Sequence, residues 1–126
     1  NQNIVRWPHI TKTREEYLQR LRDYDLDIYK NFYGPFFPQF PQSADESEYL
    51  SSMEESGIFI GGTVEESIRQ WKELFDQVPS EYITLIWHWA QVPKEVMMEE
   101  LQLFMDKVLP ELEIPDFEPI PAVAAE

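Results

Sequence analysis

Apolar side chains recur at helical spacing in four stretches of the chain, and each stretch has signals for where a helix starts or stops. In the first, the apolar stripe runs from Tyr17 to Phe32 and ends before Gly34-Pro35. Thr13, Ser43 and Thr63 each precede a glutamate by three residues, the spacing of a capping box. The pattern predicts helices over residues 14–32, 44–56, 64–77 and 93–109.

Two short runs, Ile58–Ile60 and Tyr82–Trp87, are apolar almost throughout and are separated by a predicted helix. Such runs are typical of parallel strands that are buried on both faces. Residues Asn1–Thr11 are predicted to be extended, because Trp7-Pro8 disfavours a helix there. Two parallel strands leave an unpaired edge on each side. We therefore expect other copies of the chain or another polypeptide to supply strands, which makes this chain one sector of a larger α/β barrel.

Residues Gly34–Gln42, GPFFPQFPQ, contain three prolines and three phenylalanines. Proline at this density excludes a regular helix or a central strand. The phenylalanines are too apolar for a solvated linker, so we predict a loop that lies over a hydrophobic surface. A lid over an apolar ligand and a contact between subunits are the alternatives.

Charge and composition narrow the classes of partner. The chain has 126 residues with 24 acidic and 10 basic side chains, a formal net charge of −14. So negative a surface repels nucleic acid and anionic membranes, and no apolar run approaches the roughly 18 residues of a membrane span. The absence of cysteine excludes disulfides and thiolate metal sites. It also fits a reducing compartment, so we expect a cytoplasmic location.

The second half of the chain resembles the C-terminal part of the bacterial-luciferase-like, flavin-dependent monooxygenase family. Residues 57–68, GIFIGGTVEESI, are similar to that family's strand, glycine-bearing turn and capped helix, although Val64 stands where the family usually has proline. Tyr82–Trp87 resembles the last barrel strand. Residues 99–112, EELQLFMDKVLPEL, resemble the closing helix. The likeness covers residues 57–112.

This resemblance implies the fold class α/β, as the C-terminal sector of a TIM-type (β/α)8 barrel: two parallel strands, the seventh and eighth, with flanking helices. Residues 1–56 would be a helical insertion with the Pro/Phe-rich loop. Residues 57–112 would be the last two βα units, and residues 113–126 an extended tail.

The implied activity is that of a monooxygenase in which reduced FMN activates O2 to oxidise a small organic substrate; a deazaflavin is the alternative cofactor. The implied partner is the remaining barrel polypeptide or a homo-oligomer. The alternative function is a non-catalytic barrel fragment or subunit that acts by association.

His88 is the candidate catalytic residue, because it directly follows a predicted strand, where barrel enzymes place their active sites. An imidazole titrates near neutral pH and suits acid–base work. A core histidine bonded to a backbone carbonyl is the alternative. Trp87 and Trp89 flank it as candidate substrate walls, with core packing as the alternative.

Gly61, Gly62 and Thr63 are the candidate cofactor-binding residues. They precede a predicted helix N-terminus, a place that suits an anion such as a phosphate. A tight turn with Thr63 as the helix cap is the alternative. The pairs Glu65-Glu66 and Glu99-Glu100 are predicted to be solvated, because adjacent helical residues point in different directions. His9 and His88 have no ligand spacing, so no metal site is predicted.

Overall fold

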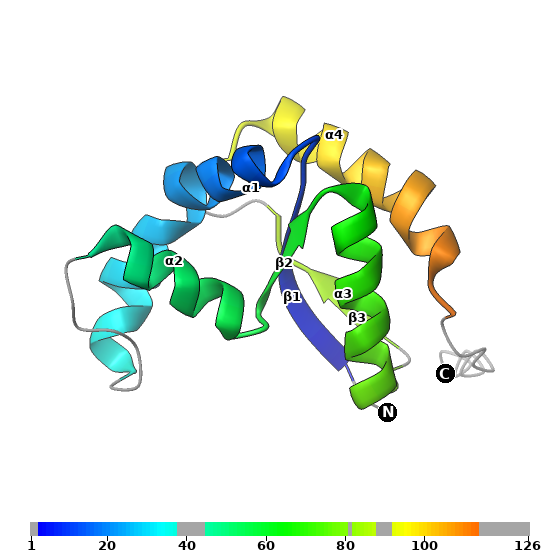
Figure 1. Ribbon diagram of the computed structural model, residues 1–126, viewed down its shortest axis with the longest axis horizontal. Helices are drawn as coiled ribbons and strands as arrows, with labels where there is room; N and C mark the ends of the chain where they lie inside the picture. The colour runs from blue at the N-terminus through cyan, green and yellow to red at the C-terminus, as the bar shows by residue number, and fades with distance from the viewer. Residues whose placement is uncertain (1–2, 38–44, 81, 88–91, 114–126) are drawn as a thin grey trace, which may run out of the picture.

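Three parallel strands form the sheet of the computed structural model, which describes residues 3–37, 45–80, 82–87 and 92–113 (Figure 1). The strands are β1 (Asn3–Ile10), β2 (Phe59–Gly62) and β3 (Tyr82–Leu85), in the order β2-β1-β3. The helices are α1 (Arg14–Arg20), α2 (Glu46–Glu55), α3 (Val64–Gln77) and α4 (Lys94–Leu103). The described part is therefore an α/β unit with a parallel sheet and flanking helices.

The prediction of two strands is wrong, because Asn3–Ile10 is a third strand and lies in the middle of the sheet. Its two halves pair with different neighbours: residues 3–6 pair with β3 and residues 7–10 pair with β2. Proline is unfavourable inside a central strand because it lacks an N–H donor. Pro8 is tolerated here because it lies in the half of β1 beyond its pairing with β3.

The strand order differs from the one expected for the last two strands of a TIM-type barrel. The strands predicted as neighbours seven and eight, β2 and β3, lie on opposite sides of β1. The sheet also draws strands from both sides of the predicted boundary between residues 56 and 57. The carboxyl end of β1 lies beside the carboxyl end of β2, because Ile10 pairs with Gly62, whereas β3 ends beside Arg6 in the middle of β1.

Two apolar clusters cover the two faces of the sheet. The first joins α3, α4 and the π-helical segment η4 (Phe104–Val108) to the sheet, with Trp71 completely buried at its centre. Trp71 packs edge-on against Phe104 at 5.9 Å between ring centroids. The second joins α1, α2 and the segments that follow α1 to Phe59. The sheet is therefore covered on both faces, as a parallel sheet requires.

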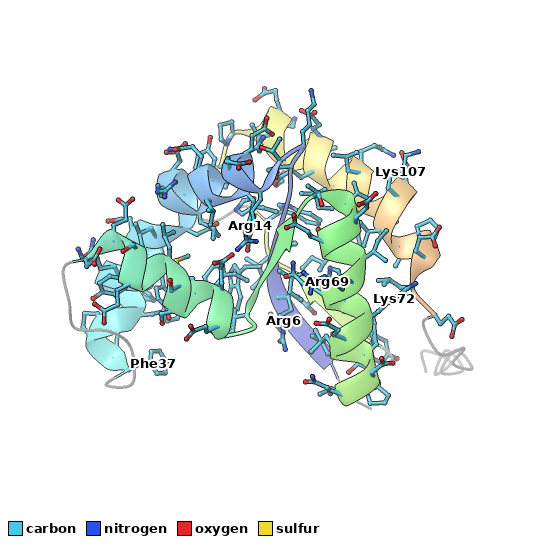
Figure 2. The ribbon with its side chains drawn as sticks, viewed as in Figure 1. Arg6, Arg14, Phe37, Arg69, Lys72 and Lys107 are labelled. Carbon is cyan, nitrogen blue, oxygen red and sulfur yellow. The ribbon has the colours of Figure 1, made fainter. Side chains whose placement is uncertain are left out.

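The first predicted helix continues from α1 through two π-helical segments, η1 (Leu21–Asp25) and η2 (Ile28–Tyr33), to a 3-10 turn, η3 (Gly34–Phe36). Phe36 in that turn is 71% exposed and packs against Phe32. Phe37 is 39% exposed and packs against Tyr33. Figure 2 shows Phe37 at the end of the helical segment, away from the sheet. The rest of the loop, residues 38–44, lies outside the described residues.

The caps agree with the sequence at two helices and differ at a third. Thr13 and Thr63 cap α1 and α3, each accepting from the amide three residues on. Asp45, in place of the predicted Ser43, caps α2 by accepting from the Ser47 amide at 3.0 Å. The last helix begins at Lys94 and ends through η4 and the 3-10 turn η5 (Leu109–Glu111). No helix among the described residues is long and apolar enough to cross a membrane.

Candidate functional site

A buried histidine lies between two buried carboxylates at the carboxyl end of the central strand. The Nδ1 of His9 is 2.9 Å from Oε2 of Glu100, and its Nε2 is 2.6 Å from Oδ2 of Asp25. Each of these three side chains is at most 3% exposed. Charged groups this deep are rare unless they are paired, so the three form one electrostatic unit.

Glu100 is the centre of this cluster. Besides His9, its carboxylate accepts a hydrogen bond from Nη1 of Arg20 at 3.1 Å and another from the indole Nε1 of Trp87 at 2.9 Å. A carboxylate has about four lone-pair sites, and three donors converge on this one, with His9 also 3.2 Å from its Oε1. This arrangement suits anchoring of the surrounding groups.

The cluster draws one group from each of several elements. His9 comes from the end of β1, Asp25 from the end of η1 and Glu100 from the middle of α4. Arg20 ends α1, and Trp87 follows β3. Segments with π-helical bonding often occur at functional sites because the extra residue changes where a side chain points. Here such a segment carries the Asp25 carboxylate that meets the imidazole.

The imidazole of His9 is held as a cation. Burial alone lowers the pKa of His9, because it disfavours the charged form. Hydrogen bonds and Coulombic attraction from Asp25 and Glu100 outweigh burial and raise the pKa from 6.5 to about 9. Near neutral pH His9 is therefore protonated, and its two N–H groups donate to the two carboxylates.

A groove opens beside this cluster, above the carboxyl ends of β1 and β2. Its volume is about 790 Å³, within the usual range for small-molecule sites. Its lining residues come from α1, from the start of α3 and from α4. The end of β1 and the loop after it supply the remaining ones. The groove is lined by Ile10, Thr11, Lys12, Glu16, Arg20, Thr63, Val64, Glu65, Glu99, Glu100 and Leu103. Arg20 and Glu100 belong to both the groove and the cluster.

The structure places Trp87, the candidate substrate wall, in the core. Its side chain is 4% exposed, packs edge-on against Phe104 at 5.8 Å between ring centroids and donates to Glu100. It is not among the residues that line the groove. Trp87 thus has the core packing that was its alternative interpretation. His88 and Trp89 lie outside the described residues, so the roles predicted for these two stay predictions.

Gly61 and Gly62 end β2, and both are needed for close packing. A Cβ at Gly61 would collide with the His9 carbonyl oxygen and the Tyr17 ring. Gly62 has a φ of +120°, and a Cβ there would collide with the Glu66 carboxylate. Thr63 is the α3 cap, as one of the two interpretations expected, and it also lines the groove. Of the three candidate cofactor residues, Thr63 alone has a side chain in the groove.

His9, Asp25 and Arg20 belong to the site although the sequence did not predict them there, and the prediction that Glu100 is solvated is wrong. Glu100 is 1% exposed. A signal was present in the helical spacing: Glu100 follows Met97 by three residues and precedes Phe104 by four, which places it on the apolar stripe. Among the described residues, no group of three His, Asp or Glu side chains has the arrangement of a metal site.

Comparisons of this chain with protein-family models, with curated proteins and with solved structures find no match.

Proposed function

We propose that this chain forms part of a flavin-dependent monooxygenase that uses reduced FMN and O2 on a small organic substrate. The chain would be the C-terminal sector of a larger α/β barrel in which β1 lies between β2 and β3, so these two strands would not be its adjacent strands seven and eight. The observation that carries the proposal is the groove at the carboxyl ends of parallel strands, with a buried charged cluster in its wall. The type of reaction is taken from the sequence resemblance over residues 57–112. When bound, the flavin would activate O2; the chain would hold the substrate and exclude water.

One part of the flavin, its phosphate, would bind in the groove. Lys12, Arg20 and Thr63 offer two cations and a hydroxyl for a phosphate, beside the N-terminus of α3. The ring system needs an apolar wall, and the groove offers only a few apolar side chains among four glutamates. The remaining barrel polypeptide, or a second copy of the chain, would supply that wall. A deazaflavin would meet the same donors.

The test is flavin uptake by the protein together with any polypeptide that accompanies it through purification. We expect the visible absorbance bands of oxidised flavin, and we expect added FMN to bind. Arg20→Gln should weaken FMN binding roughly tenfold, as expected for a lost charge-assisted hydrogen bond. Arg22→Gln is the matched control, because Arg22 pairs with Glu46 outside the groove. A folded, colourless assembly that takes up no FMN would contradict the proposal.

Association without catalysis is the second candidate function. Within the described residues, β2 and β3 each pair on one side only, which leaves two open sheet edges. Tyr82 and Thr84 on β3 are exposed. Open parallel edges favour pairing with another chain. Native mass spectrometry would detect a stable complex in preparations that lack flavin; a monomer at all concentrations would exclude this function.

A further inference from the structure

Two sets of contacts join the walls of the groove. Arg20 on α1 donates directly to Glu100 on α4, and His9 joins Glu100 to Asp25. The α1 wall continues into the segment that carries Asp25, and the α4 wall carries Glu100. His9 contacts both carboxylates from the end of β1, which lies between these helices (Figure 1). The α1 and α4 walls are therefore joined by the Arg20–Glu100 ion pair, and the imidazole ties Glu100 to the segment that continues α1.

This arrangement requires the cationic form of the ring. An imidazolium has two N–H donors, one for each carboxylate, whereas a neutral imidazole has a single N–H. After deprotonation one ring nitrogen presents a lone pair to a carboxylate oxygen. At 2.6 Å or 2.9 Å, two acceptors repel each other, so one of the two contacts must open.

The other charges around His9 strengthen this requirement. Asp25 and Glu100 bring two negative charges, while Arg20 brings one positive charge through its bond to Glu100. With His9 protonated, the cluster is electrically balanced. The ring of Tyr24, on η1, lies 6.5 Å from the imidazole, and the Trp87 indole contributes an uncharged donor. Loss of the proton leaves a net negative charge in a nearly water-free place, which is costly.

We propose that His9 is the positioning residue of the groove: its imidazolium holds Asp25, on the segment that continues the α1 wall, to Glu100 in the α4 wall, and loss of its proton opens one of these two contacts and widens the groove. The inference concerns the groove alone and does not require a flavin. It differs from the association function, because the change occurs within one chain. Both ends of the proposed movement, Glu16 on α1 and Glu99 on α4, are exposed groove residues.

The absence of cysteine allows a direct test. Spin labels attached to Glu16→Cys and Glu99→Cys report the width of the groove by pulsed electron paramagnetic resonance. From about pH 6 to about pH 10, we expect the distance between labels to increase, with a midpoint near the His9 pKa of about 9. The same labels in a His9→Gln background should show no pH-dependent change. In a His88→Gln background they should show the full change.

A distance that stays constant in labelled protein whose circular dichroism remains native across this range would overturn the proposal. So would a transition that persists in His9→Gln or that disappears in His88→Gln. If His9→Gln does not fold, the His88→Gln result and the 15N resonances of the His9 ring decide: the ring must titrate at the same midpoint as the distance. None of these measurements involves flavin, so their outcome is separate from that of the FMN binding test.

Discussion

As the pH rises through about 9, stability should fall because His9 loses its proton. The folded protein raises the pKa of His9 from 6.5 to about 9, through two carboxylates that overcome the effect of burial. A group whose pKa is raised by folding stabilises the folded state in its protonated form. This stabilisation is fully present below about pH 6.5, the unfolded value, and is lost as the pH rises through about 9.

The size of the effect follows from the two pKa values. The difference between 6.5 and about 9 corresponds to about 3 kcal/mol of unfolding free energy. The group is buried, with the His9 side chain 3% exposed, so solvent screening reduces this figure little. For a domain with a total stability of roughly 5–15 kcal/mol, the loss is large enough to measure.

Urea unfolding at several pH values, from about pH 6 to about pH 10, measures this loss of unfolding free energy. The difference between wild type and His9→Gln cancels the titration of groups that both proteins share. We expect this difference to shrink by about 3 kcal/mol over the range. His88→Gln is the matched control, since it removes the other histidine of the chain, and it should keep the wild-type fall. A difference between wild type and His9→Gln that is independent of pH would refute the assignment of a cationic His9.

Two further predictions concern single positions. Glu100→Gln removes the charge that its two cationic partners face and should lower the unfolding free energy by about 3–5 kcal/mol, while Glu99→Gln, on an exposed neighbour, should change it by less than about 0.5 kcal/mol. Equal effects in urea unfolding would contradict the burial of the cluster. Gly61→Ala should cost about 1–3 kcal/mol because the added methyl meets the backbone of β1. Gly34→Ala, where the nearest atom lies at 3.6 Å, should cause no loss in thermal unfolding.

Local signals were sufficient for helix α3 and insufficient for strand β1. The bounds Val64–Gln77 were predicted from the Thr63 cap and the apolar period, and the structure has the same bounds. Strand Asn3–Ile10 was predicted only as extended chain, because Trp7-Pro8 is read locally as a break. Its central place in the sheet depends on two distant strands. Strand β3 pairs with β1 as far as Arg6, and strand β2 pairs with β1 from Trp7 onwards.

The candidate site shows the same limit more strongly. His9 is 16 residues from Asp25 and 91 residues from Glu100, so no spacing rule connects the three. The predicted site was built on residues that follow a strand, which is where His9 also lies, but β1 was not recognised as a strand. The acidic side chains within two apolar helical stripes, Asp25 and Glu100, were the usable signal. A carboxylate on a buried face needs a partner, and a chain with two histidines and ten lysines and arginines offers few.

The free-energy cost of burying His9, Asp25 and Glu100 indicates that these residues have a role besides stability. Burying charges is expensive, and replacing buried ion pairs by apolar side chains of similar size is often neutral or stabilising. Stability alone therefore does not account for His9, Asp25 and Glu100 at this place. The charged groups add hydrogen bonds, which have a defined direction. The two N–H groups of the His9 ring fix the positions of two helical segments, and Glu100 orients the Arg20 guanidinium at the edge of the groove. An apolar core would hold the helices close without fixing that cation. The cluster is thus better explained by the groove that it shapes than by the fold that it stabilises, and its neutral apolar replacement should keep the fold while losing the defined width of the groove.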